Sequence, residues 1–259
     1  MTLPFDAAAQ GPRLPRIVWM LWLQGWDKAP PVAQAARQSW ERRSGWEVRA
    51  LDAERLGEFL PRDEIEFILS GTKEMESISN LIRCGLLHRH GGVWADATAV
   101  CSRSLDDWLP AAAGSGFFAF AAPGAGRALS NWFLASAPGH TIIDHWRAAC
   151  LGYWSGRAQR HTYFWMHGLF AEQLALEPAF QEAWSAVPKV SARHRFHFGP
   201  RSPDLLAPPP ADLREVLADP QVPVFKLSHK GMEGAGEGSL LAALCRFARS
   251  ETLDDGGPV

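Results

Sequence analysis

The strongest constraint on the fold is a continuous apolar run, Ile17 to Leu23, which ends at Gln24-Gly25. Its length suits a strand that is buried on both faces, because such strands lack the alternation of half-exposed ones. Pro30-Pro31 then opens a helical pattern that ends at Gly45. The stretch Trp46 to Leu51 alternates like a second strand. This order of strand, helix and strand predicts an α/β domain with a mostly parallel central sheet.

Later patterns extend the same architecture. Apolar residues at helical spacing between Glu74 and His90 predict a helix, which Gly91-Gly92 ends. A helical pattern from about residue 129 to 187 predicts a helical insertion in the C-terminal half. The remaining expected elements are strands over Val93 to Thr98, Phe117 to Ala122 and Val222 to Leu227, and a helix over Leu240 to Ala248.

Size and composition narrow the class of protein. A chain of 259 residues with 47% hydrophobic and 21% charged residues is ordinary for a globular domain. The net charge of −2 excludes a general nucleic-acid binder, because no basic excess is present to neutralise phosphates. We expect a flexible lead-in over residues 1–13, a single domain over 14–250 and a disordered tail over 251–259.

The cysteines bear on the cellular compartment. The four cysteines are scattered, and no secretion signal or run long enough to cross a bilayer is found. Scattered cysteines in such a chain are typically reduced and buried. We therefore expect a cytoplasmic protein, and docking on the inner face of the membrane stays open.

The most informative stretch for chemistry runs from Ser79 to Thr98. A helix leads through two glycines into a short strand whose end carries Asp96 and Thr98, two residues apart. Ligands of open α/β sheets gather outside the carboxyl ends of strands. Hard cations prefer such oxygen ligands and bridge to diphosphates. Arg83 would pair with a phosphate or brace Asp96. The alternative is that Asp96 caps a loop and Arg83 forms a structural ion pair.

With these residues in place, the chain resembles the bacterial capsular polysaccharide synthesis proteins, which are related to the DXD-bearing sugar transferases of glycosyltransferase family 32. The resemblance covers about residues 14–230. Its most specific pieces are the block Gly91 to Thr98 and the late Lys226-Leu227-Ser228-His229-Lys230.

The resemblance implies a GT-A-like fold and transfer of a sugar, with retention of configuration, from a nucleotide-diphosphate donor such as a UDP-sugar. Asp96, Arg83, His229 and Lys230 would be catalytic. The donor would contact Trp22, Leu23, Gln24, Asn80, Arg83, Gly92, Asp96, Thr98 and Asn131. Asp96 and His229 would hold Mn²⁺ or Mg²⁺.

Two departures from the family pattern affect the metal. Thr98 stands where the DXD motif has its second carboxylate, and Asn80 stands where an aspartate is usual. Fewer carboxylates leave less negative charge to hold a divalent ion. Lysine or arginine is the alternative means of neutralising the leaving diphosphate. The same departures allow an inactive GT-A-like subunit that binds glycans or acts as a scaffold in a capsule assembly complex.

The acceptor side depends on weaker signals. The acceptor implied by the resemblance is an oligosaccharide or a lipid-linked glycan. His167 and Trp165, in an aromatic run, are candidates to contact it. The alternative for both is an ordinary structural side chain, since aromatic residues at helical spacing more often pack in the core.

Overall fold

A computed structural model describes residues 13–70 and 73–250. The predicted tail, and all of the predicted lead-in except residue 13, lie outside the described residues. The fold is centred on a five-stranded sheet in the order β2-β1-β3-β6-β5. Its strands are β1 (Ile17–Leu21), β2 (Glu47–Leu51), β3 (Gly92–Ala95), β5 (Phe117–Gly124) and β6 (Arg127–Ser136). Only β6 runs against the other four, so the predicted mostly parallel sheet is confirmed.

Strand β1 lies inside the sheet, as its apolar sequence predicts. Val18, Trp19 and Met20 are fully buried. Alternate side chains point to opposite faces of a strand. Trp19 accordingly joins the hydrophobic cluster on one face, while Val18 and Met20 join the cluster on the other. The sheet therefore needs a covering layer on each side.

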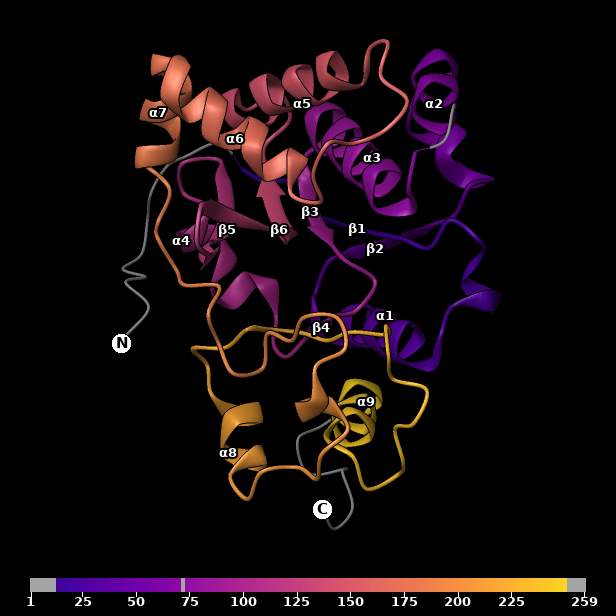
Figure 1. Ribbon diagram of the computed structural model, residues 1–259. Helices are drawn as coiled ribbons and strands as arrows, with labels where there is room; N and C mark the ends of the chain where they lie inside the picture. The colour runs from indigo at the N-terminus through magenta and orange to yellow at the C-terminus, as the bar shows by residue number, and fades with distance from the viewer. Residues whose placement is uncertain (1–12, 71–72, 251–259) are drawn as a thin grey trace.

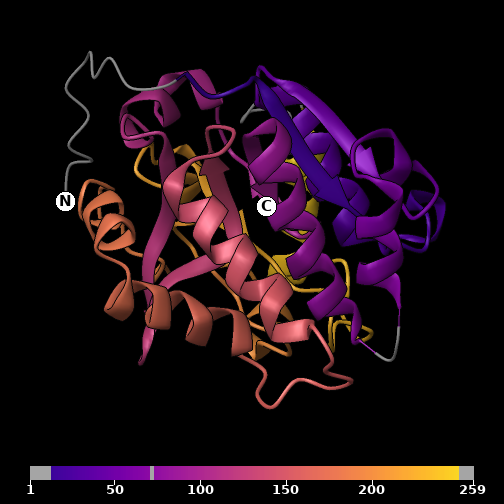
Figure 2. The ribbon, with the colours of Figure 1, turned by 90° about the horizontal axis from the view of Figure 1, so that it is seen from above.

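Figures 1 and 2 show helices packed on both faces of this sheet. One layer contains α2 (Arg62–Leu69), α3 (Met75–His90), α5 (Thr141–Trp154), α6 (Trp165–Leu176) and α7 (Pro178–Ser185). The other contains α1 (Pro31–Arg43), the short α4 (Leu109–Ala112) and, packed on α1, α9 (Leu240–Arg249). The predicted α/β class is confirmed, including the helical segment in the C-terminal half. The proposed domain limits, 14–250, stay a prediction.

Strand β6 departs most from the structure that its sequence predicts. The apolar pattern from about residue 129 was interpreted as helical, whereas Arg127–Ser136 forms an antiparallel hairpin with β5. The last four residues of β6, Phe133 to Ser136, are all buried, because this strand lies between β3 and β5. A strand buried on both faces shows no alternation, so periodicity alone cannot distinguish it from a buried helix.

A second, two-stranded sheet brings the C-terminal segment against the central domain. It pairs β4 (Ala99–Cys101) antiparallel with β7 (Val224–Lys226), in a register that places Ala99 opposite Lys226. Strands β3 and β7 are shorter than the sequence predicts: β3 ends at Ala95, Asp96 to Thr98 form a turn into β4, and β7 covers only Val224 to Lys226. The short α8 (Leu213–Ala218) precedes β7. Among the described residues, no helix is long and apolar enough to span a bilayer.

Candidate functional site

Asp96 lies directly after the carboxyl end of β3, at the edge where the loop after β1 also emerges. Its backbone N–H donates to the Trp132 carbonyl at 2.8 Å, and its carbonyl accepts from Ala99 N–H at 2.8 Å, which closes the turn. The carboxylate accepts hydrogen bonds from Arg83 Nη2 at 2.9 Å and from Trp94 Nε1 at 3.0 Å. Its side chain stays 27% exposed. Asp96 is thus fixed in orientation and still accessible.

Arg83 holds this arrangement from inside the domain. It projects from α3, is 4% exposed, and stacks over the Trp94 ring with the guanidinium carbon 4.8 Å from the ring centroid. Its Nη1 donates to the Asn131 carbonyl in β6. Burial lowers the pKa of Arg83, while the negative charge of Asp96 opposes that shift. Of the two roles predicted for Arg83, the structure shows the bracing of Asp96.

Asn80 and Asn131 extend the same network. Asn131 Nδ2 donates to Asn80 Oδ1 at 3.1 Å, which links α3 to β6 beside Arg83. Asn80 is 8% exposed, and Asn131 is half-buried. Both are predicted donor contacts, and both lie next to Arg83, which connects them to Asp96.

The second residue of the strand-end motif, Thr98, faces a lysine that the site prediction did not include. Lys226 Nζ, at the end of β7, donates to Thr98 Oγ1 at 2.5 Å and to the Leu227 carbonyl at 3.0 Å. The same Nζ lies 3.8 Å from Asp96 Oδ2. Burial, with the charges of Arg83 and Lys230, lowers the pKa of Lys226, and Asp96 raises it. A lysine inside an otherwise apolar strand pattern was the available signal.

His229 and Lys230 follow this strand. The His229 ring meets the Trp22 ring edge to face, with centroids 5.4 Å apart, so the loops after β1 and β7 touch. Burial, followed by the charges of Lys226 and Lys230, lowers the pKa of His229. Lys230 Nζ pairs with Glu76 Oε1 at 2.5 Å, and this hydrogen bond lowers the pKa of Glu76. The Lys230 ammonium is therefore paired with a carboxylate of α3.

The remaining predicted site residues differ in their distance from Asp96 and in their exposure. Gly92 begins β3, at the opposite end of that strand from Asp96. Trp165 is 1% exposed, donates to Ser77 Oγ at 3.1 Å and stacks on Tyr153, so it packs in the core and offers no free face to a sugar. His167 is partly buried beside Phe164. In the loop after β1, Leu23 packs against the core and Gln24 is exposed.

The donor set around Asp96 fits a divalent cation poorly. Within the described ranges, no group of three or more His, Cys, Asp or Glu side chains is placed to hold a metal. One carboxylate oxygen of Asp96 already accepts two hydrogen bonds, and the other faces the Lys226 ammonium. Mg²⁺ and Mn²⁺ select oxygen-rich, negatively charged sites. The residues present are instead suited to an anion.

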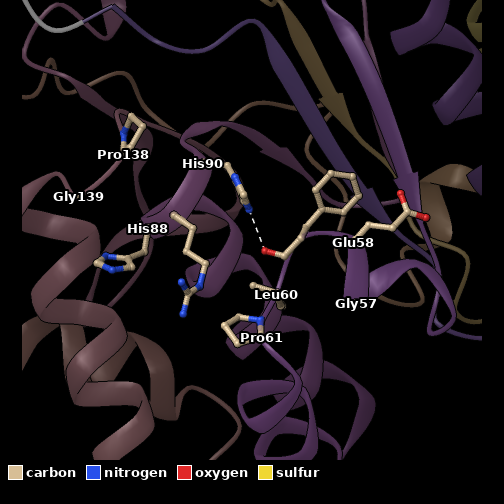
Figure 3. Close-up of a pocket in the computed structure, with 10 residues that line it drawn as sticks. Gly57, Glu58, Leu60, Pro61, His88, His90, Pro138 and Gly139 are labelled. Carbon is tan, nitrogen blue, oxygen red and sulfur yellow. Dashed lines mark hydrogen bonds between the residues drawn. The ribbon is translucent and has the colours of Figure 1, made fainter.

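A separate hollow of about 750 Å³ lies at the other end of the sheet (Figure 3). It is lined by the segment Gly57 to Pro61, the last turn of α3 and the Pro138-Gly139 turn. His90 Nε2 lies 2.8 Å from the Phe59 carbonyl across it. Since β3 starts just after His90 and Asp96 follows its far end, this hollow is distinct from the site around Asp96.

Comparison with known proteins places the chain in a family. Residues 6–234 match the profile of the capsular polysaccharide synthesis proteins. The match covers most of the chain, which therefore belongs to this family.

Curated relatives are glycosyltransferases by name. The chain is 30% identical over 185 residues to glycosyltransferase afumC of Aspergillus fumigatus, covering 63% of this chain and 46% of that protein. It is 27% identical over 160 residues to O-glycosyltransferase PaGT of Phomopsis amygdali, covering 54% of this chain and 39% of that protein. The chain thus spans less than half the length of these two relatives.

Among solved structures, the PaToxG glycosyltransferase aligns with a TM-score of 0.46 and 11% identity, over 68% of this chain and 74% of that one. A similarity this distant supports no statement about the site.

Proposed function

We propose that this chain is a glycosyltransferase that moves a sugar from a nucleotide-diphosphate donor, such as a UDP-sugar, to a saccharide acceptor in surface polysaccharide synthesis. The observation that carries the proposal is the accessible carboxylate of Asp96 at the carboxyl end of β3, braced by Arg83 and facing Lys226. Membership of the family and the names of the relatives support the same reaction class.

The proposed chemistry depends on charge and position. The donor's pyrophosphate would lie against the cationic side chains at this edge, and the loop over Trp22 to Gln24 would hold the base. The acceptor oxygen bonds to the anomeric carbon as the bond to the diphosphate oxygen breaks. The electron pair leaves with the diphosphate, and the acceptor proton passes to the leaving oxygen. Configuration is retained because the acceptor approaches on the face from which the diphosphate departs. The chain's own groups hold and neutralise the diphosphate and form no covalent intermediate.

The acceptor would enter beside α6. His167 is partly buried there, and burial, followed by the charges of Arg127 and Arg83, lowers its pKa to about 4. A neutral imidazole both donates and accepts a hydrogen bond, which suits a sugar hydroxyl. The exposed rings of this segment are Tyr163 and Phe164, which are 52% and 42% exposed. These two rings replace Trp165 as candidates for contact with a sugar face.

The test compares the wild-type protein with Asp96→Asn in the presence of several UDP- and GDP-sugars and an oligosaccharide acceptor. We expect the variant to lose at least about 100-fold in released nucleoside diphosphate, because the substitution removes the charge that holds Arg83 and faces the Lys226 ammonium, and so disturbs the cations that would bind the diphosphate. Asparagine is preferred to alanine, since it keeps an acceptor for Arg83 and Trp94. The matched control is Asp144→Asn, an exposed aspartate that lies 3.4 Å from His88.

Two outcomes would contradict the proposal. Wild-type turnover by Asp96→Asn would remove Asp96 from the site. No turnover by the wild-type protein with any donor, combined with retained binding of an oligosaccharide, would favour a glycan-binding or scaffold role in a capsule assembly complex.

A further inference from the structure

Lys226 is held rigidly beside the strand-end turn. Its backbone N–H donates to the Phe196 carbonyl at 3.0 Å, and its carbonyl accepts from Phe198 N–H at 2.7 Å. The next residue, Leu227, donates its N–H to the Thr98 carbonyl at 2.8 Å. Backbone contacts on both sides therefore fix where the side chain starts. Pairing between segments that are distant in the sequence thus places the ammonium beside Thr98.

The ammonium keeps capacity for a ligand. It has three N–H donors. Two are used by Thr98 Oγ1 and the Leu227 carbonyl, and Asp96 Oδ2 at 3.8 Å is beyond hydrogen-bond distance. The side chain is 18% exposed, close to the 27% of Asp96 beside it. The side chain is therefore partly open to solvent, and one N–H donor is left for a ligand oxygen.

The cations at this edge differ in how closely each is paired with a carboxylate. Asp96 is matched by Arg83, and Glu76 is matched by Lys230. Lys226 lies near Asp96, but that carboxylate is already committed to Arg83 and Trp94. Lys226 is thus a cation whose neighbouring carboxylate lies beyond hydrogen-bond distance, at the carboxyl end of β3, where a diphosphate would add negative charge. A divalent ion placed on Asp96 would instead lie beside an ammonium and be repelled.

We propose that the Lys226 ammonium supplies, at the donor's diphosphate, the positive charge that a divalent cation would otherwise supply, so that this site binds a nucleoside diphosphate without metal. Thr98, at the position of the second carboxylate, orients this ammonium through its hydroxyl. Asp96 positions the ammonium from the other side. This inference deepens the proposed function and depends on it.

The first experiment titrates the wild-type protein with UDP, GDP and CDP by calorimetry, in EDTA and in Mn²⁺. We expect the tightest of these to bind with affinities that agree within about twofold between the two buffers. Binding that requires Mn²⁺ and disappears in EDTA would overturn the metal-free site and leave the proposed function standing. No binding of any nucleoside diphosphate in either buffer would instead defeat the proposed function itself.

The second experiment assigns the charge to one side chain. Lys226→Met should weaken binding in EDTA by about 10- to 100-fold, which is the value of a hydrogen bond to a charged group. The control is Lys189→Met, because Lys189 is an exposed lysine outside this site whose ammonium also donates two hydrogen bonds, to the Trp184 and Val187 carbonyls. Unchanged binding by Lys226→Met, or a loss seen only in Lys230→Met, would overturn the assignment.

The third experiment rebuilds a cation site. The double variant Thr98→Asp with Lys226→Met places two carboxylates two residues apart and removes the ammonium. We expect its binding in EDTA to be weak and Mn²⁺ to restore at least about tenfold, because a hard cation gains the oxygen ligands it prefers. A folded double variant that is indifferent to Mn²⁺ would show that Lys226 does not occupy the cation's position.

Discussion

Arg83 Nη2 donates a hydrogen bond of 2.9 Å to Asp96 Oδ1, and so joins the middle of α3 to the end of β3. The guanidinium is buried, whereas the carboxylate is partly open to solvent. The buried guanidinium therefore has a structural role, whereas the partly exposed carboxylate can contact a ligand. Arg83 is therefore a positioning residue, and its effects on stability and on ligand binding can be separated.

Replacement of Arg83 by methionine should destabilise the protein. The change leaves Asp96 without its buried partner and removes the contact over Trp94. We expect a loss of about 2–4 kcal/mol in the free energy of unfolding, measured by urea denaturation. The control is Arg62→Met, which breaks an ion pair with Glu66 on an arginine that is 93% exposed. That control should change stability by less than about 0.5 kcal/mol. A similar small loss for both variants would show that Arg83 is not a buried anchor.

The pKa of His167 makes stability depend on pH. Burial, with the charges of Arg127 and Arg83, lowers this pKa to about 4 from the usual 6.5. Because the unfolded state binds the proton first, stability is complete above pH 6.5 and falls as the pH drops toward 4. On going from pH 7.5 to pH 5, the wild-type protein should lose about 2 kcal/mol more than His167→Gln. Parallel pH profiles for the two proteins, followed by urea denaturation, would contradict this prediction.

Gly92, a predicted donor contact, has a structural role at the start of β3. Its φ is +89°, and a Cβ atom there would lie 2.6 Å from the Ile17 carbonyl oxygen in the neighbouring strand. Gly92→Ala should therefore destabilise the protein by about 2–4 kcal/mol. Gly152→Ala is the control, since Gly152 lies in α5 and, apart from its chain neighbours and the backbone of its own helix, no atom lies within 4 Å of the added methyl group. That variant should be neutral or more stable by up to about 1 kcal/mol. Equal melting temperatures for the two variants would refute the close approach of β1 and β3 at this point.

The four cysteines should not react with thiol reagents in the folded protein. All are free and buried, and burial raises the pKa of Cys101 to about 12. Since the thiolate is the reactive form, Ellman's reagent at pH 8 should titrate few thiols in native buffer. In 6 M guanidinium chloride it should titrate four per chain. Rapid reaction of any thiol without denaturant would mean that its surroundings open readily.

Much of the fold follows from local sequence. The buried strand β1, the helix that begins at Pro31, and the helix that ends before Gly91-Gly92 are all predictable from apolar spacing, proline and glycine. The placement of Asp96 at a strand end follows from the same patterns. Strand β6 does not, because burial on both faces removes the periodicity that would identify it.

Strand pairing between distant parts of the chain determines which side chains meet at the site. Sequence patterns identified basic residues at and after the end of β7, but they selected Lys230 for the site and left out Lys226, four positions earlier. The choice depends on the register of β7 against β4, which brings Lys226 to a threonine 128 positions earlier in the chain. Local sequence thus determined which segments are strands and where a carboxylate emerges from the sheet. Tertiary structure alone decided which cation faces that carboxylate, because side-chain direction at the end of a short strand is set by its pairing partner.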